Sequence, residues 1–244
     1  MRKNILILGA GSDMARALCA ELAGGGYDLF LAGRNVDELS KDAKDLEIRF
    51  EIQAEVFYFD ALDFDSHAGF YEHLNPQPYG VVVAFGLLGD ENRARRDPQE
   101  WQRIINTNFT GCVSILSLAA NRMEKAGEGF IVGISSVAGD RGRASNYVYG
   151  SAKAGMSAFL SGLRNRLFSS GVRVITVKPG FVRTKMTRDL DLPSRLSATP
   201  EEAAGNIYKA ILRNRDIVYT RWMWRWIMAF IKHIPERIFK RMSI

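Results

Sequence analysis

Continuous apolar runs alternate with helix-like segments along most of this chain, and that alternation limits the possible folds more than any other feature. The first run, Asn4–Leu8, is closed by Gly9. Runs rich in Val, Ile and Leu are typical of strands that are buried on both faces of a parallel sheet. Further runs follow at Leu29–Ala32, Val56–Phe59, Val81–Phe85, Phe130–Ile134 and Val172–Val177.

Segments with helical periodicity separate these runs. They lie at Ala15–Ala23, Val36–Ile48, Asp97 to about Ala126, Tyr149–Ser169, and from Thr199 onward. The last segment opens with Thr199, Pro200 and Glu202, which is the pattern of a capped helix start. Because strand and helix alternate throughout, the sequence predicts an α/β fold, a single doubly wound parallel sheet covered by helices on both faces.

The positive charge of the chain is concentrated near its C-terminal end. The formal net charge is +6, but residues 217–244 alone hold six Lys or Arg and one Glu. The other 216 residues hold 27 basic and 26 acidic side chains, so we expect no nucleic-acid partner. With 47% hydrophobic residues the chain can form its own core. We expect one domain, residues 1–220, followed by a basic appendage, residues 221–244.

The cysteines and histidines show neither metal-ligand spacing nor a disulfide framework. Cys19 and Cys112 lie in apolar helical patterns, where a buried free thiol is expected. The apolar run near the N-terminus is too short for a signal peptide, and no run is long enough to span a membrane. The sequence therefore predicts no metal site and a cytoplasmic protein.

The first apolar run ends in a glycine-rich turn, Gly9-Ala10-Gly11-Ser12-Asp13-Met14-Ala15. Small residues before a helix let the backbone approach a pyrophosphate, which the helix N-terminus attracts. Gly9, Gly11, Ser12, Asp13 and Met14 are therefore candidate cofactor contacts. Asp13 stands where the dinucleotide fingerprint has a glycine, so it is expected to point away and cap the helix. A plain strand-to-helix turn is the alternative interpretation.

Arg34 follows the second apolar run. An Arg at this position suits the 2′-phosphate of NADP, whereas an acid would suit NAD. Arg34 therefore favours NADP. The alternative is an ordinary surface Arg at a strand end.

A second group of polar residues is spaced for acid–base chemistry. Tyr149 and Lys153 are four residues apart and follow Ser136 by a short loop. On a helix they share one face, so the Lys153 ammonium is expected to lower the pKa of the Tyr149 phenol. Tyr149 then serves as general acid or base, and Ser136 binds the reacting oxygen. Asn108, a polar residue in an apolar helix, is expected to support a water that relays protons to Lys153.

The turn after the last apolar run and its neighbours complete the expected site. Pro179, Gly180, Val182 and Thr184 follow that run and are expected to hold the nicotinamide carboxamide. Residues 185–198 are expected to form a substrate lid. Its expected apolar lining is Met186, Leu190, Leu192 and Leu196. Arg141 and Arg143 are candidates for binding a substrate phosphate.

These motifs together resemble the short-chain dehydrogenase/reductase family over residues 3 to about 220. The resemblance implies a single Rossmann-type domain, a nicotinamide cofactor, NAD(P)H, and a homodimer or homotetramer. It assigns a catalytic tetrad that also contacts the cofactor, formed by Asn108, Ser136, Tyr149 and Lys153.

The resemblance extends to the adenine end of the cofactor. Asp60 and Ala61 match the positions that contact the adenine. Val83-Ala84-Phe85-Gly86 lies where the family usually has Asn-Asn-Ala-Gly. This departure alters the wall beside the adenine ribose and removes no catalytic group.

Several segments narrow the resemblance to one subfamily. They are Asp60–Asp63, Ser66-His67, Ala84–Asp90, Val148–Ser151 and His233–Phe239. They are similar to the reductase component of the decaprenylphosphoryl-ribofuranose 2′-epimerases, which reduces a 2-keto pentofuranose on a polyprenyl phosphate to the arabinofuranose donor for cell-wall arabinan. This implies a flavoprotein oxidase partner that makes the ketone. It also implies NADH, against the indication from Arg34.

Two other functions stay open. One is reduction of a different ketone, such as a 3-oxoacyl or steroid-like lipid. The other is a catalytically idle dinucleotide-binding or membrane-scaffold protein, which the atypical Asp13, Ala15 and Val83–Gly86 allow.

The C-terminal segment has a composition of its own. Three of the four Trp lie in Arg221–Ile231, and Lys232, Arg237, Lys240 and Arg241 follow among apolar residues. Trp with Lys and Arg is typical of a helix in a membrane interface, so we expect contact with the inner face of the cell membrane. Pro235 is expected to split the segment into two helices. Packing against the body or a second subunit is the alternative.

Overall fold

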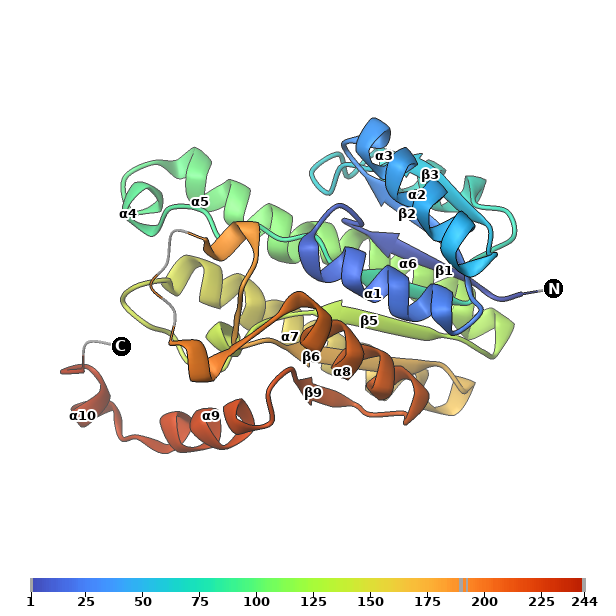
Figure 1. The fold of residues 1–244 in the computed structure, drawn as a ribbon. Helices are drawn as coiled ribbons and strands as arrows, with labels where there is room; N and C mark the ends of the chain where they lie inside the picture. Colours follow the sequence, from blue (N-terminus) through green and yellow to red (C-terminus); the bar gives the residue numbers. More distant parts are fainter. Residues whose placement is uncertain (1, 189–190, 192, 243–244) are drawn as a thin grey trace.

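The computed structural model describes residues 2–188, 191 and 193–242, and its centre is a seven-stranded parallel sheet (Figure 1). The strands run in the order β3-β2-β1-β4-β5-β6-β9. Their bounds are β1 Asn4–Leu8, β2 Asp28–Gly33, β3 Ala54–Tyr58, β4 Gly80–Val83, β5 Phe130–Ile134, β6 Arg173–Lys178 and β9 Ile217–Tyr219. The predicted doubly wound α/β fold is confirmed.

Helices cover both faces of the sheet because successive strand residues point to opposite sides. Ile5 and Ile7 pack with α1, α2 and α8, whereas Leu6 and Leu8 pack with α3, α6 and α7. The first layer consists of α1 Asp13–Gly24, α2 Val36–Phe50 and α8 Pro200–Leu212. The second consists of α3 Ser66–His73, α6 Gly111–Ala126 and α7 Tyr147–Leu167. Cys19 and Cys112 are buried free thiols in these layers, as predicted.

The helix predicted from Asp97 to about Ala126 is one continuous helical stretch with an irregular centre. It comprises α5 Pro98–Ile105, a π-helical turn at Asn106–Thr110, and α6. A short helix, α4 Glu91–Ala94, precedes it. The irregular turn carries Asn108, and π-helical turns are frequent at functional sites.

Short elements surround the carboxyl ends of the strands. A two-residue strand β7, Phe181–Val182, pairs with β8, Ser197–Ala198. Single 3₁₀ turns lie at Val137–Gly139, Phe168–Ser170, Lys185–Thr187 and Ser194–Leu196.

The basic C-terminal segment forms two helices, α9 Met223–His233 and α10 Glu236–Phe239, separated by Pro235 as predicted. Trp224 and Met228 of α9 are buried against Val137. The Trp224 indole nitrogen donates to the Leu196 carbonyl at 3.0 Å, and its ring lies so close to Gly180 that a Cβ there would collide with it. In the described part of the chain, no helix has the length and apolar character needed to cross a bilayer.

Candidate active site

Two adjoining cavities open at the carboxyl ends of the parallel strands, where ligands bind in sheets of this kind. Their volumes are about 390 and 300 Å³. Both are lined by the same central residues: Gly11, Ser12, Ala84, Phe85, Gly86 and Met186. Two cavities with a common centre suit a molecule built from two joined halves, such as a dinucleotide.

The larger cavity is formed by the predicted adenine-side residues. Gly9, Arg34, Asp60 and Ala61 line it together with the central residues. Gly9 has a φ of +81° and lies against the backbone of Phe85, so a side chain there would collide with that backbone. Arg103 and Thr107 also line this cavity. Sequence reasoning missed both, although Thr107 directly precedes Asn108.

The smaller cavity brings together the predicted catalytic and nicotinamide-side residues. They are Asp13, Met14, Ser136, Tyr149, Lys153, Pro179, Gly180, Val182 and Thr184. Residues from β5, α7 and the turn after β6 thus meet across one space. Of the residues predicted for catalysis and cofactor binding, Asn108 is the one that lines neither cavity.

Ser12, not Asp13, caps the first helix. The Ser12 hydroxyl accepts the Ala15 N–H at 3.3 Å. The Asp13 carboxylate instead accepts the backbone N–H of Lys185 at 2.6 Å, since its place in the first turn of α1 directs it outward to the segment after β7. The expectation that Asp13 caps the helix is therefore wrong, and Asp13 joins the glycine turn to the predicted lid.

Two glycines allow α7 to lie directly on the turn that follows β5. A Cβ on Gly139 would collide with the backbone of Lys153, and one on Gly150 would lie 2.9 Å from the Ala138 carbonyl oxygen. This close approach puts the Tyr149 hydroxyl within hydrogen-bonding reach of the Ser136 side chain. The Ser136 hydroxyl also accepts the Ala138 N–H at 3.1 Å, which fixes its position.

Burial, not the neighbouring cation, dominates the ionisation of the site. It raises the pKa of Tyr149 to about 12, and the hydrogen bond with Ser136 only partly opposes this. Burial likewise lowers the pKa of Lys153. The Lys153 nitrogen lies 5.8 Å from the centre of the Tyr149 ring and donates to the Ile134 carbonyl at 2.9 Å. The expected lowering of the Tyr149 pKa by Lys153 is therefore wrong for this arrangement.

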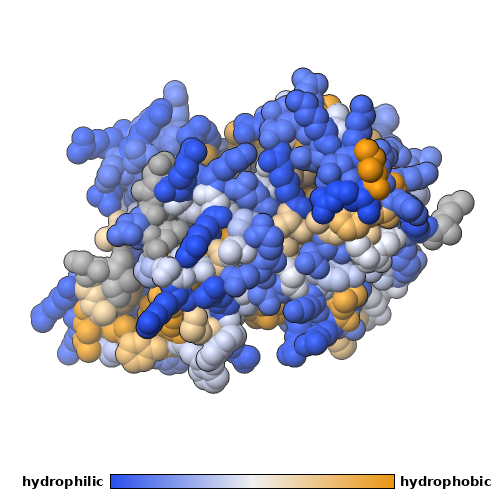
Figure 2. Space-filling view, viewed as in Figure 1, coloured by the Kyte–Doolittle hydropathy of each residue, from blue (hydrophilic) through white to orange (hydrophobic). Residues whose placement is uncertain are grey.

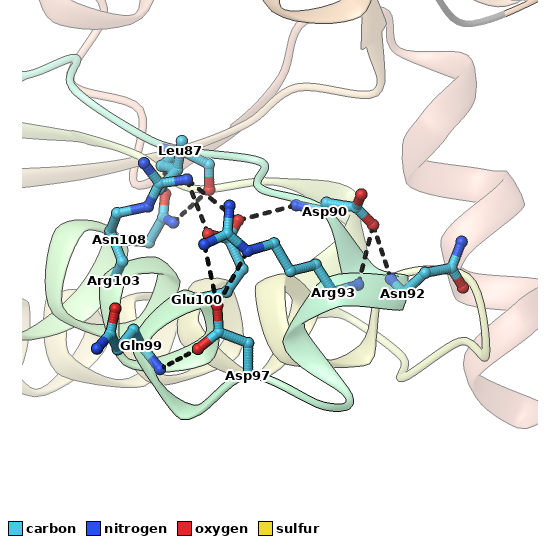
Figure 3. A network of polar contacts seen from close by, with 9 residues as sticks. All are labelled: Leu87, Asp90, Asn92, Arg93, Asp97, Gln99, Glu100, Arg103 and Asn108. Carbon is cyan, nitrogen blue, oxygen red and sulfur yellow. Dashed lines mark hydrogen bonds and ion pairs between the residues drawn. The ribbon is translucent and has the colours of Figure 1, made fainter.

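Asn108 holds the backbone of Leu87, a residue that lines the larger cavity. Its amide nitrogen donates to the carbonyls of Leu87 at 2.6 Å and Ile104 at 2.9 Å, and its oxygen accepts the Leu87 N–H at 3.1 Å. Both amide protons are thus engaged with the backbone. The water relay to Lys153 stays a prediction, whereas the support that Asn108 gives to Leu87 is direct (Figure 3).

A second polar network joins the loop after β4 to α4 and α5 (Figure 3). The Glu100 carboxylate is 3% exposed, pairs with Arg103 at 2.8 Å and accepts the Asp90 N–H at 3.1 Å. Asp90 in turn caps α4 by accepting the Asn92 N–H at 2.9 Å. The loop after β4 is therefore held in place at several points along its length.

One of the other sequence expectations is contradicted, and a second falls partly outside the described residues. Arg141 donates to the Ile231, Lys232 and Ile234 carbonyls at the end of α9. It also pairs with Glu236 at 2.7 Å. Arg141 is therefore committed to the C-terminal helices and not available for a substrate phosphate. Of the expected lid lining, Met186 borders both cavities, whereas Leu190 and Leu192 lie outside the described residues.

Comparisons with known proteins agree on one family. The pattern of the short chain dehydrogenases matches residues 3–194. An uncharacterized oxidoreductase of Mycobacterium tuberculosis is 37% identical over 241 residues, covering 98% of this chain and 96% of the relative. The acetoacetyl-CoA reductase of Allochromatium vinosum is 29% identical over 225 residues, covering 85% of this chain and 90% of the relative.

A solved structure shows the same fold. The short-chain dehydrogenase of Sphingobium yanoikuyae in complex with NADPH superposes with a TM-score of 0.84 at 22% identity, covering 96% of this chain and 97% of the other.

A parallel sheet of this order, with a glycine turn after its first strand, is the architecture of dinucleotide-dependent oxidoreductases. Since the family pattern spans residues 3–194 and a relative is 37% identical over nearly the whole chain, the chain belongs to the short-chain dehydrogenase/reductase family. It is an NAD(P)-dependent oxidoreductase. The roles of the individual site residues stay predictions.

Proposed function

We propose that this protein is an NAD(P)H-dependent ketoreductase. The observation that carries the proposal is the meeting of Ser136, Tyr149 and Lys153 in a cavity that continues into the glycine turn. An idle dinucleotide-binding protein has no physical need for a Ser–Tyr hydrogen bond and a buried Lys at this place.

In the proposed reaction the bound nicotinamide supplies a hydride to the ketone carbon. The Ser136 hydroxyl donates a hydrogen bond to the ketone oxygen and fixes its position. Tyr149 is protonated at neutral pH, as an ordinary tyrosine is, and burial strengthens this by raising its pKa. Its phenol can give a proton to the more basic alkoxide that forms. With the cofactor bound, the Lys153 ammonium, which lines the same cavity, would donate a hydrogen bond to the cofactor ribose.

The proposed substrate is a polyprenylphosphoryl 2-keto pentofuranoside, supported by the resemblance of Asp60–Asp63, Ala84–Asp90 and His233–Phe239 to reductases of such sugars. A flavoprotein oxidase would then supply the ketone by oxidising the 2-hydroxyl group. A polyprenyl-linked substrate resides in a bilayer, so this proposal places the enzyme on the inner face of the cell membrane. The family resemblance adds the expectation of a homodimer or homotetramer.

The direct test follows NADH and NADPH absorbance with a polyprenylphosphoryl 2-keto-ribofuranoside beside acetoacetyl-CoA and simple ketones. We expect the keto sugar to have the highest kcat/KM. The variant Tyr149→Phe should lose at least about 10³-fold in turnover, while cofactor binding, measured by fluorescence, stays unchanged. Full activity of Tyr149→Phe would overturn the mechanism, and no reduction of any ketone by the wild-type enzyme would overturn the function.

One observation favours a second candidate substrate. The relative from Allochromatium vinosum is an acetoacetyl-CoA reductase and matches 85% of this chain. A 3-oxoacyl thioester is therefore the alternative ketone. The same panel separates the two, because a higher kcat/KM for acetoacetyl-CoA than for the keto sugar would select the thioester.

A further inference from the structure

Helix α9 carries large apolar side chains on two opposite faces. Trp224 and Met228 point inward and are buried. Trp222, Trp226 and Phe230 are 73%, 66% and 73% exposed. These three follow one another at intervals of four residues, so they form a single stripe along the outer side of the helix. We call this set the outer stripe. A stripe of large aromatic side chains is costly to leave in water, so it calls for a covering surface.

Exposed cations lie on the same C-terminal segment as the outer stripe. Arg225 and Lys232 of α9 and Arg237, Lys240 and Arg241 of the α10 region are exposed. In the described part of the chain, none of these five forms an ion pair. The single acid of residues 217–244, Glu236, is already paired with Arg141. The covering surface must therefore accept aromatic side chains and carry negative charge.

Further apolar side chains extend the same region. Ile238 and Met242, beyond Pro235, are 56% and 42% exposed. In Figure 2 the orange and pale side chains gather at the lower left, where Figure 1 places α9 and α10. The region thus continues past α9 and is wider than the stripe on one helix.

Because Trp beside Lys and Arg is the composition of helices that lie in a bilayer interface, we infer that α9 and α10 dock on an anionic lipid surface. The outer stripe enters the headgroup region, and the five cations contact acidic headgroups. The Trp224 ring lies against Gly180, which lines the smaller cavity, so docking of α9 holds this cavity close to the bilayer. This inference deepens the proposed function by explaining how a lipid-linked substrate is met. It does not depend on which ketone is reduced.

The test measures binding of the full-length protein to sedimented vesicles of phosphatidylcholine with or without about one third phosphatidylglycerol. The triple variant Trp222→Ser, Trp226→Ser and Phe230→Ser should bind anionic vesicles at least about tenfold more weakly. A matched control replaces three exposed apolar residues elsewhere, Ile48→Ser, Phe168→Ser and Leu212→Ser. The control should bind like wild type. Lys240→Gln with Arg241→Gln should weaken binding about fivefold per cation.

Each outcome decides for or against docking. Equal sedimentation of wild type and the triple variant overturns the inference, as does equal binding to neutral and anionic vesicles. A triple variant that changes the oligomeric mass in light scattering, without wild-type binding to vesicles, assigns the outer stripe to a second copy instead. Activity on a soluble ketone should stay unchanged in the triple variant, since these side chains lie outside both cavities. If the wild-type enzyme reduces no ketone, the proposed function is overturned, but the vesicle-binding result still stands.

Discussion

At the residue scale, the two ionisable groups of the site are governed by their surroundings more than by each other. Burial holds Tyr149 in the protonated form and lowers the pKa of Lys153. The group proposed to donate a proton in reduction is thus already in its donating form at neutral pH, before any substrate binds.

The pH dependence should reflect this. A raised pKa means that the Tyr149 proton is retained as the pH rises past about 10, the usual tyrosine value. We expect kcat/KM for ketone reduction to stay constant from neutral pH to about 10, and that for alcohol oxidation, which needs the phenolate, to rise with pH. Stopped-flow pH profiles in both directions measure this. A fall in reduction already between about pH 7 and 9 would contradict the raised pKa.

Arg34 is the residue on which cofactor preference is expected to depend. It is exposed and lines the adenine-side cavity, where the Glu38 carboxylate is engaged by Arg16. Arg34→Ala should weaken NADPH binding by about 10- to 100-fold, the loss of a charged hydrogen bond, and leave NADH within about threefold. Arg34→Lys, which keeps the charge, should retain most of the affinity. Fluorescence titration of both cofactors checks this, and an unchanged dissociation constant for NADPH would argue for NADH as the natural cofactor.

Most of the predicted site residues line the two cavities, whereas several of their predicted contacts were wrong. The spacing of Ser136, Tyr149 and Lys153 was enough to bring them into one cavity, because a strand, a turn and a helix fix their geometry. The partner of Asp13 could not be predicted, since Lys185 is 172 positions away. Arg141 failed as a phosphate ligand for the same reason, because its partners lie on α9.

At the element scale, the loop after β4 depends on a buried carboxylate. Glu100 binds both Arg103 and the Asp90 N–H (Figure 3). Glu100→Ala leaves an N–H unpaired and should lower the free energy of unfolding by about 1–3 kcal/mol. Glu100→Gln keeps the oxygen toward Asp90 and should cost less. Urea denaturation of both variants measures the difference, and equal stability of Glu100→Ala and wild type would contradict it.

Long periodic elements were predictable and short ones were not. The apolar runs gave β1 and β5 with their observed bounds, and the capping residues gave the start of α8. Strand β9 has three residues and the β7–β8 pair has two residues a side, which is too short for a periodicity. The π-helical turn at Asn106–Thr110 was not predicted either. A single turn of this kind inserts one extra residue into an α-helix, and one inserted residue leaves no recognisable periodicity in the sequence.

At the scale of the whole molecule, α9 is a structural part of the enzyme on its inner face. Trp224 fills the space between Val137, Phe181 and the Leu196 carbonyl. Trp224→Ala should lower the free energy of unfolding by about 3–5 kcal/mol and the Tm by about 10 °C. The control Trp226→Ala, on the outer stripe, should change stability by less than about 0.5 kcal/mol. Differential scanning calorimetry compares them, and equal melting of the two variants would show that α9 does not contribute to the core.

The hydrogen bond between Asp13 and the Lys185 amide has a practical consequence. It joins the turn expected to face the pyrophosphate to the segment expected to cover the substrate, so the exchange rate of one backbone hydrogen reports on both. A hydrogen protected by a carboxylate exchanges only when that contact opens. The Lys185 amide is thus a built-in reporter. Its exchange rate can be followed by mass spectrometry or NMR as NADPH is titrated. Because no substrate is present, any change reports closure of the segment that begins at Lys185 and not the chemical step.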